Sequence, residues 1–227
     1  MVKRGTNPTK YMIIKNKYLY EQHKNVPPDY YEDCKTNILQ KLWHQKKLQG
    51  ITKYLKKIGR TEKVLDIGCH SGDLSQRIGE LLGANVTAID ISESAINYAR
   101  KKYPQINFDV ADITEYKTLP KDKFDLVTAF DVLEHIPHTH KVAKNISSTL
   151  RKGGYLIVGV PSNRLLFKII WSIWTKFMKG KVWRGTHYKG FCLENLNKEL
   201  SENGVTLIEE GKANFNLWNI NTYKHHE

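Results

Sequence analysis

Short apolar runs alternate with longer amphipathic stretches through the middle of the chain. Strand-type runs are predicted at Lys63–Ile67, Asn85–Ile89, Ile106–Val110, Phe124–Phe130 and Tyr155–Val160. Apolar residues recur at helical spacing between them, over Leu74–Leu82, Glu93–Tyr103 and Lys141–Leu150. Strands that alternate with helices in this way form a parallel sheet that is covered on both faces. The pattern therefore predicts an α/β domain.

Both ends of the chain depart from this alternation. Pro27 and Pro28 close a polar arm, and a helix is predicted over residues 29–58. Beyond Pro161 the pattern predicts an apolar helix at 164–179, a basic loop, a helix at 193–203, and strands at 205–209 and 213–218. We therefore divide the chain into an N-terminal arm and capping helix (1–59) and a domain (60–227) that carries a basic amphipathic insertion at 164–190.

Charge is distributed unevenly along the 227 residues. There are 36 Lys and Arg against 23 Asp and Glu, a net charge of +13. Residues 1–60 alone carry +10 and residues 164–190 carry +7, so the remainder is slightly acidic. This distribution predicts an anionic partner at the two basic segments rather than over the whole surface.

Composition narrows the class of protein. With 40% apolar residues the chain can bury a core, which excludes a disordered protein. The three cysteines (Cys34, Cys69 and Cys192) are odd in number and form no Cys-x-x-Cys pair, so neither a disulfide framework nor a zinc site is expected. No secretion signal or membrane-spanning run is visible. We expect a cytoplasmic protein, with peripheral attachment to a membrane as an option.

A glycine-containing turn follows the first predicted strand. Val64–Ile67 leads into Gly68-Cys69-His70-Ser71-Gly72 and then a helix, which is the arrangement of a nucleotide site. A dinucleotide fingerprint needs Gly at the first, third and sixth positions, but His70 and Asp73 occupy the last two of these. No Gly-Lys-Ser/Thr follows, so a phosphate loop is excluded as well.

Carboxylates stand at three successive strand ends. Asp66 precedes the glycine turn, Asp90 ends the second strand and Asp112 lies just beyond the third. A carboxylate at the tip of the second strand can accept hydrogen bonds from both hydroxyls of a ribose, and Asp112 could accept one from an adenine amino group. Together they suit a cationic adenosyl amino acid.

With these motifs in this order, the chain resembles class I S-adenosylmethionine-dependent methyltransferases over residues 60–160. The resemblance implies a Rossmann-like, doubly wound, mostly parallel seven-stranded sheet with helices on both faces. It also implies that S-adenosylmethionine is the methyl donor. The implied cofactor residues are Asp66, Gly68, Cys69 and Gly72 at the methionine side, Asp90 and Ile91 at the ribose, Asp112 and Ile113 at the adenine, and Phe130.

The segment Phe130-Asp131-Val132-Leu133-Glu134-His135-Ile136-Pro137 is similar to that of ubiquinone-biosynthesis O-methyltransferases. Asn163-Arg164, Gly185-Thr186-His187 and Lys189-Gly190-Phe191 follow in the order found in those enzymes. We predict His135 as general base, with Glu134 beside it. Alternatively Asp131, Glu134 and His135 hold a divalent cation such as magnesium, or Glu134 and His135 only begin a helix.

The predicted helix after Pro161 is apolar with a polar stripe. Lys168, Ser172 and Thr175 are spaced by three or four residues, and Trp171 and Trp174 lie among them. Tryptophans beside lysines are typical of a helix at an anionic membrane surface. A lid over a lipophilic acceptor and a purely internal packing role are the alternatives.

Taken together, the sequence predicts O-methylation of a small, lipophilic, quinone-like, phenol-like or lipid-linked acceptor near a membrane. One alternative is a methyltransferase of RNA or another nucleic acid, in which the lysines contact phosphates. The nucleic-acid hypothesis is disfavoured because no RNA-binding module is recognisable in the sequence. The other alternative is a non-catalytic protein that binds S-adenosylmethionine and a partner.

Overall fold

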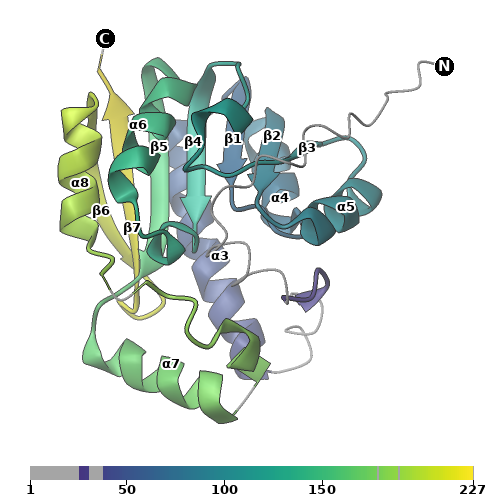
Figure 1. Ribbon diagram of the computed structural model, residues 1–227, viewed down its shortest axis with the longest axis vertical. Helices are drawn as coiled ribbons and strands as arrows, with labels where there is room; N and C mark the ends of the chain where they lie inside the picture. Colours follow the sequence, from purple (N-terminus) through teal and green to yellow (C-terminus); the bar gives the residue numbers. More distant parts are fainter. Residues whose placement is uncertain (1–25, 31–37, 178, 189, 227) are drawn as a thin grey trace.

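The computed structural model describes residues 26–30, 38–177, 179–188 and 190–226. A seven-stranded sheet lies at its centre, in the order β3-β2-β1-β4-β5-β7-β6 (Figure 1). The strands are β1 (Lys63–Ile67), β2 (Asn85–Asp90), β3 (Asn107–Val110), β4 (Phe124–Phe130), β5 (Leu150–Pro161), β6 (Val205–Ala213) and β7 (Trp218–His225). The α/β alternation predicted from the sequence is confirmed.

Five neighbouring strands, from β3 to β5, run parallel, while β7 is antiparallel to β5 and β6 is antiparallel to β7. The mostly parallel sheet implied by the resemblance is thus confirmed. From β1 the chain builds outward to β2 and β3, then crosses to the other side of β1 to form β4. Ligands of doubly wound sheets bind at such a reversal, beyond the carboxyl ends of the strands.

Helices cover both faces of the sheet. They are α3 (Ile38–Ile58), α4 (Asp73–Leu82), α5 (Glu93–Lys102), α6 (Thr139–Thr149), α7 (Leu165–Phe177) and α8 (Leu193–Glu202), with the 3-10 helices η2 (Tyr116–Thr118), η3 (Leu133–His135) and η4 (Lys179–Trp183). Ile51 of α3, Ile78 of α4 and Ile96 of α5 belong to the core of one face. Ile146 of α6 and Leu196 of α8 belong to the core of the other.

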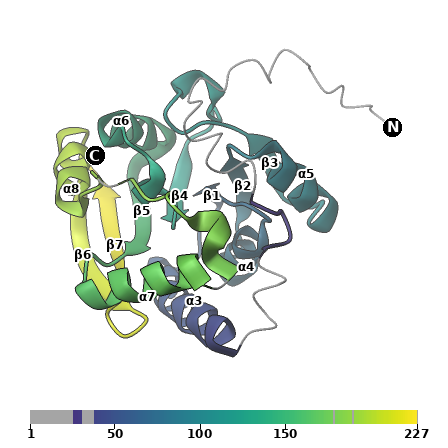
Figure 2. The same cartoon turned by 60° about the horizontal axis from the view of Figure 1, so that its bottom comes forward.

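Helix α7 and η4 are set apart from these two layers. They lie at the end of the molecule to which β4 points, and α7 lies beside α3 (Figures 1 and 2). The rings of Trp43 on α3 and Phe167 on α7 are 6.3 Å apart. Helices α3 and α7 therefore cover the carboxyl ends of the parallel strands. None of the helices in the described ranges has the length and apolarity needed to cross a membrane.

Two predicted elements differ from the structure. The strand predicted at 213–218 is wrong, because Asn214, Phe215 and Asn216 all have positive φ and form the turn between β6 and β7. The last strand comes later than predicted, at Trp218–His225. Of the helix predicted over residues 29–58, the structure describes α3 from Ile38 to Ile58, and Tyr30 is also helical; residues 31–37 and the arm 1–25 lie outside the described residues.

Candidate active site

The turn after β1 brings backbone to the edge of a cleft. Gly68 has φ 76° and Gly72 has φ 80°, values that side chains disfavour. A Cβ on Gly68 would lie 2.6 Å from Val132, and one on Gly72 would lie 2.6 Å from Phe108. Close packing and positive φ thus both require glycine here. The turn is tied to the end of β2, since the amide of Gly68 donates to the carbonyl of Ile89 at 2.8 Å.

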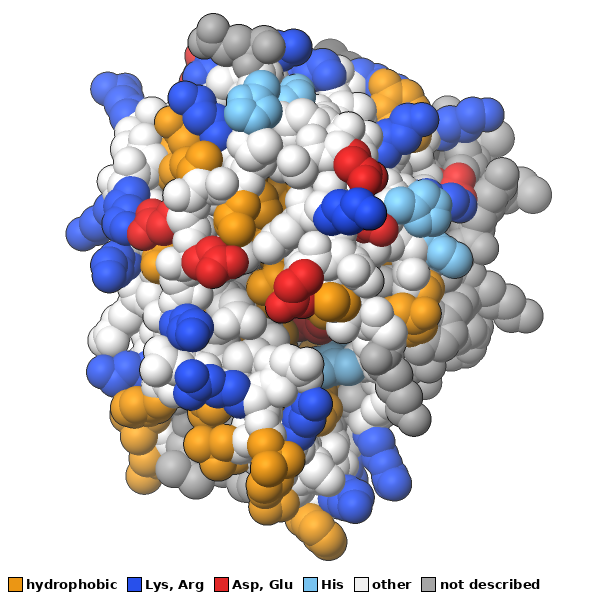
Figure 3. All heavy atoms as spheres, turned by 90° about the vertical axis from the view of Figure 1, so that its left-hand side faces the viewer, with side chains coloured by type: hydrophobic (Ala, Val, Ile, Leu, Met, Phe, Trp, Pro, Cys, Tyr) orange, Lys and Arg blue, Asp and Glu red, His pale blue; other side chains and the backbone are white. Residues whose placement is uncertain are grey.

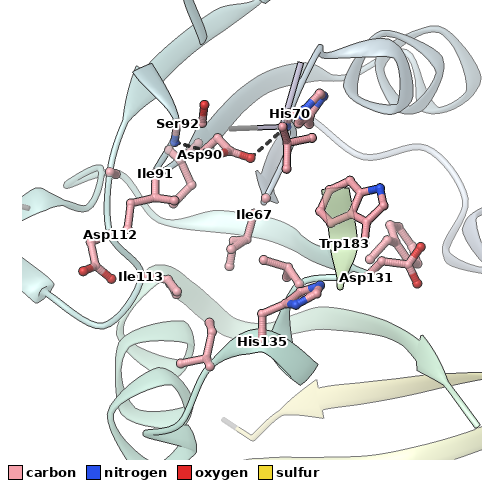
Figure 4. A pocket seen from close by; sticks show the side chains of 17 residues that line it. Ile67, His70, Asp90, Ile91, Ser92, Asp112, Ile113, Asp131, His135 and Trp183 are labelled. Atoms are coloured by element: carbon pink, nitrogen blue, oxygen red, sulfur yellow. Dashed lines mark hydrogen bonds between the residues drawn. The ribbon is translucent and has the colours of Figure 1, made fainter. Parts of the chain in front are cut away.

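Asp90 stands at the tip of β2 with both carboxylate oxygens oriented by backbone amides. The amide of His70 donates to Oδ2 at 2.9 Å and that of Ser92 donates to Oδ1 at 2.8 Å (Figure 4). A carboxylate oxygen can accept more than one hydrogen bond, so each oxygen retains capacity for a ligand hydroxyl. The geometry suits the ribose role that the resemblance implies.

Asp112 follows β3 and is 1% exposed. Its Oδ1 accepts hydrogen bonds from the amide and the hydroxyl of Thr114, at 2.8 and 2.7 Å. Its Oδ2 is buried and has no partner among the described residues. Because a buried unpaired acceptor is unfavourable, a donor from a ligand, such as an adenine amino group, would complete the site.

Not all the predicted cofactor residues face the cleft. The structure places Gly68, Asp90, Ile91, Asp112, Ile113 and Phe130 along its wall. Asp66 lies behind the turn, where Ser75 and Thr128 donate to its carboxylate at 2.6 and 2.7 Å. Burial raises the pKa of Asp66 to about 6. With Cys69 and Gly72, which also lie off the wall, Asp66 shapes the turn.

Several lining residues of the cleft were missed from the sequence, and two of them come from the N-terminal segment and from η4. Val26 precedes the predicted N-terminal helix, and Trp183 belongs to η4, yet both line the cleft. Tyr30 packs edge-on against Trp183 with ring centroids 5.4 Å apart. The segment at 26–30 and η4 therefore cover the cleft together. No local signal predicts this, since the two segments are more than 150 residues apart in the chain.

A second, larger cavity of about 340 Å³ opens beside the cleft, between α3, α7 and the ends of β4 and β7. All five tryptophans of the chain line it: Trp43, Trp171, Trp174, Trp183 and Trp218. Mainly apolar and aromatic walls with a few polar groups are typical of a site for a small organic ligand. The N-terminal helix thus contributes to this cavity through Trp43, His44 and Lys47.

Three residues line both the cleft and the cavity: Asp131, His135 and Trp183. They mark the junction at which a ligand in one space would meet a ligand in the other. Asp131 itself is held in a left-handed conformation, φ 54°, and its amide donates to the carbonyl of Gly159 at 2.8 Å. Strained non-glycine residues are often found at functional sites.

Comparison with known proteins decides the family. A model of the methyltransferase domain family matches residues 40–210. The chain belongs to this methyltransferase family. The predicted likeness to ubiquinone-biosynthesis O-methyltransferases is confirmed as a likeness of sequence: that of Coxiella burnetii is 30% identical over 146 residues, and that of Glaesserella parasuis is 31% identical over 134. These matches cover 62% and 56% of both chains, so this methyltransferase spans about three-fifths of the length of the curated relatives that it matches.

Solved structures share the fold. The magnesium protoporphyrin IX methyltransferase from Synechocystis PCC 6803, with bound SAH, superposes with a TM-score of 0.70 at 21% identity, covering 92% of this chain and 98% of that one. An N-methyltransferase from Bradyrhizobium japonicum in complex with S-adenosyl-l-homocysteine gives 0.61 at 19% identity, covering 92% and 97%. The Rossmann-like class I fold of this methyltransferase is thereby confirmed.

His135 of the methyltransferase is oriented by its backbone surroundings. Its Nδ1 lies 2.9 Å from the carbonyl of Thr186, and a carbonyl oxygen only accepts hydrogen bonds. The neutral ring therefore carries its hydrogen on Nδ1, which leaves Nε2 as the basic nitrogen. This contact joins the segment after β4 to the Gly-Thr-His motif, 51 residues later.

Glu134 is buried beside His135, with 4% of its surface exposed. Neither carboxylate oxygen has a hydrogen-bond partner among the described residues. Burial first, and the nearby charge of Asp131 second, raise the pKa of Glu134 well above its usual value. Burial therefore favours the neutral carboxyl group, which can donate a hydrogen bond.

His187 completes this group, although in the sequence it is singled out only as part of the Gly-Thr-His motif. Its ring stacks on Trp171, with centroids 4.2 Å apart, and lies edge-on to His135 at 5.0 Å. Burial lowers the pKa of His187 to about 4, and it does the same to His44 on α3. Both imidazoles are therefore neutral at pH 7 and add no charge to the cavity.

The three predicted ligands of a divalent cation do not converge. The carboxylate of Asp131 accepts hydrogen bonds from Lys47 Nζ and from Trp218 Nε1, so an ammonium stands where a cation would bind. Among the described residues, the donor atoms that do gather are those of Glu134, His135 and His187, within 4.8 Å of one another. Two imidazoles and one carboxylate do not suit magnesium, which takes oxygen ligands. A magnesium site does not fit this arrangement.

Proposed function

We propose that the protein transfers the methyl group of S-adenosylmethionine to an oxygen of a small lipophilic acceptor of the quinol, phenol or lipid-linked class. The observation that carries this proposal is the pair of adjoining spaces. One is lined by carboxylates suited to an adenosyl ligand, the other by tryptophans, and they share Asp131, His135 and Trp183. The curated relatives named as O-methyltransferases support oxygen as the methylated atom.

The residues at the junction suggest how the acceptor would react. Methyl transfer from a sulfonium is an in-line displacement, so alignment of the two ligands is the main contribution of the enzyme. His135 Nε2 takes the proton of the acceptor hydroxyl, while the carbonyl of Thr186 fixes the ring. The neutral carboxyl of Glu134 donates a hydrogen bond to the acceptor. The acceptor oxygen then attacks the methyl carbon, and the carbon–sulfur bond breaks to leave a neutral thioether.

We also propose that α7 attaches the enzyme to an anionic membrane surface. Here the prediction from the sequence changes in detail, because Trp171 and Trp174 turn inward and line the cavity instead of facing outward. The exposed apolar side chains of α7 are aliphatic or phenyl, and Lys168 and Lys176 are exposed on the same helix; the apolar ones are Leu165, Leu166, Ile169, Ile170, Ile173 and Phe177. Figure 3 shows hydrophobic side chains gathered at the foot of the molecule, with Lys and Arg near them. This combination suits insertion between lipid headgroups.

The cofactor part of the proposal is tested at Asp90. Its replacement in Asp90→Ala removes two charged acceptors, so we expect affinity for S-adenosylhomocysteine to fall about 100-fold. Calorimetry on the purified protein measures this, with Asp122→Ala, an exposed acid at the opposite end of β1, as the matched control. Unchanged affinity in Asp90→Ala, or no binding by the wild type, would contradict the proposal.

The acceptor part is tested with methyl-labelled S-adenosylmethionine and two probes, a membrane lipid extract and purified RNA. We expect label in a solvent-extractable product that carries a methoxy group, and its loss in His135→Ala. Label in the RNA with none in the lipid fraction would instead establish the nucleic-acid alternative.

A further inference from the structure

Lys47 is a buried lysine at the junction of the two spaces. Only 9% of the residue is exposed, although its neighbour Lys46 on α3 is exposed. Its ammonium group donates to Oδ2 of Asp131, 84 residues away, and lies 5.5 Å from the ring centroid of Trp218. Lysine is almost never buried in this way unless it is paired. The sequence pattern does not distinguish Lys47 from the other lysines of its helix.

The ammonium of Lys47 has more N–H donors than its contact with Asp131 uses. Lysine carries three N–H groups, and the contact with Asp131 uses one of them. No second acceptor for Lys47 occurs among the described residues, while the side chain lines the large cavity. Two charge-assisted donors are therefore available to a ligand in that cavity, next to the residue that also lines the cofactor cleft.

Among the described residues that line the large cavity, Lys47 is the one lysine or arginine. The titratable groups around it are Asp131 after β4, His44 on α3, Glu134 and His135 on η3, and His187. Burial keeps His44 and His187 neutral, because it lowers the pKa of each to about 4. Burial also raises the pKa of Glu134 and so favours its neutral form. The pKa of Asp131 is held low, chiefly by Lys47 against the effect of its own burial, so Asp131 is an anion.

We propose that Lys47 is an oxyanion subsite: its ammonium, fixed in place by Asp131 and Trp218, binds the deprotonated oxygen of the acceptor. The inference rests on the proposed function and specifies its acceptor as one that reacts in ionised form. The acceptor O–H bond breaks, its proton passes to His135 Nε2, and the oxygen accepts an N–H from Lys47. The oxygen then forms its bond to the methyl carbon as the carbon–sulfur bond breaks.

The electrostatic reason is the environment of the pair. An opposite charge close to an ionisable group favours its charged form, and a site with little water strengthens the effect. A phenol placed against Lys47 therefore loses its proton at lower pH than it does in water. Asp131 opposes this through its own charge, but it holds the ammonium at the junction, where the oxyanion and the sulfonium would meet.

The test uses 4-nitrophenol as the probe, because its phenolate absorbs visible light and its ionisation can be followed directly. Protein saturated with S-adenosylhomocysteine is titrated with pH in the presence of the probe. We expect the pKa of the bound probe to lie below its value in water. In Lys47→Met it should rise by at least one unit, which is a tenfold loss of phenolate at a given pH. Lys47→Arg should keep most of the effect.

Three measurements separate this role from a structural one. Lys46→Met, which changes the exposed neighbour, should leave the pKa of the bound probe unchanged. The double variant Lys47→Met/Asp131→Asn removes both charges, so it avoids an uncompensated buried carboxylate and should still show the rise. Affinity for S-adenosylhomocysteine reports folding in the single variants, and circular dichroism reports it in the double variant, because Asp131 lines the cofactor cleft.

The inference is overturned if the pKa of the bound probe is the same in the wild type and in Lys47→Met. It is also overturned if the wild type binds S-adenosylhomocysteine and no 4-nitrophenolate. Failure of the proposed function would look different, since the wild type would then bind no S-adenosylhomocysteine at all.

Discussion

At the scale of single residues, the site is built by burying groups that usually face water. Lys47, Glu134 and His187 line an apolar cavity. Burial disfavours the charged form of each side chain, so the charge state depends on the neighbouring groups. Burial raises the pKa of Glu134 and lowers that of His187 to about 4, so it favours the neutral form of both, whereas the ammonium of Lys47 is paired with the carboxylate of Asp131. Neutral imidazoles and one fixed ion pair are what an acceptor with a dissociating hydroxyl needs around it.

The neutral histidines predict a pH dependence of stability. The pKa of His187 is about 4 in the folded protein and near 6.5 in the unfolded chain. Stability from this group is therefore complete above pH 6.5 and is lost as pH falls from 6.5 toward 4. Between pH 7 and pH 5 the loss is about 2 kcal/mol.

His187→Gln should therefore narrow the difference in unfolding free energy between pH 7 and pH 5, as measured by urea denaturation. His140→Gln, which changes a histidine on the exposed face of α6, is the control. An equal pH dependence in wild type and His187→Gln would contradict the burial of a neutral ring.

At the scale of elements, the strand ends and the helices that connect or precede the strands form different parts of the site. The ends of β1, β2 and β3 with their turns form the cofactor cleft, while α3, α7 and η4 form the acceptor cavity. The β6–β7 turn is the element that departs furthest from its expected conformation. Three successive residues, Asn214, Phe215 and Asn216, have φ between 49° and 63°. Asparagine tolerates this region, but phenylalanine does not.

Phe215→Gly should stabilise the protein. Phe215 is 82% exposed, so little packing is lost, and glycine removes the steric cost of the left-handed conformation. We expect the free energy of unfolding to rise by about 1 kcal/mol, as measured by chemical denaturation. Phe215→Ala keeps the Cβ and should show no such gain; an equal gain in both variants would mean that the exposed ring, not the backbone, was unfavourable.

At the scale of the whole molecule, positive charge and exposed apolar surface coincide. The insertion 164–190 carries +7 and includes α7 with its exposed apolar side chains. Along the sequence, the net charge of +13 is thus concentrated in two segments, 1–60 and 164–190, that contain none of the strands of the sheet. If the enzyme attaches to a membrane through this end, α7, which covers the large cavity, would lie against the membrane.

The membrane proposal predicts the behaviour of a triple variant. Leu166→Gln, Ile169→Gln and Phe177→Gln change exposed residues that do not line the cavity. We expect binding to vesicles of phosphatidylglycerol and phosphatidylcholine to weaken at least tenfold, as measured by sedimentation, and to weaken with salt in the wild type. Ile208→Gln, an exposed apolar residue of β6, is the matched control. Equal binding by the triple variant and the wild type would exclude α7 as the contact.

The sequence by itself determined the α/β fold and most of the cofactor cleft. Gly68, Asp90 and Asp112 each stand where a strand ends, and strand ends of a parallel sheet converge because the strands share one direction. Local pattern is therefore enough to bring them together. The likeness to methyltransferases adds their roles. Asp66 lies behind the cleft wall, because its carboxylate accepts hydrogen bonds from Ser75 and Thr128.

The acceptor cavity was decided by the tertiary structure. Which face of α7 is covered depends on its packing against α3, and this packing turned Trp171 inward. The pairing of Lys47 with Asp131 joins groups 84 residues apart, and that of His135 with Thr186 joins groups 51 residues apart. Sequence periodicity describes neighbours on one element and carries no information about contacts between distant elements. For this reason the cofactor site could be predicted from the sequence, whereas the groups proposed to select and ionise the acceptor became visible only in the fold.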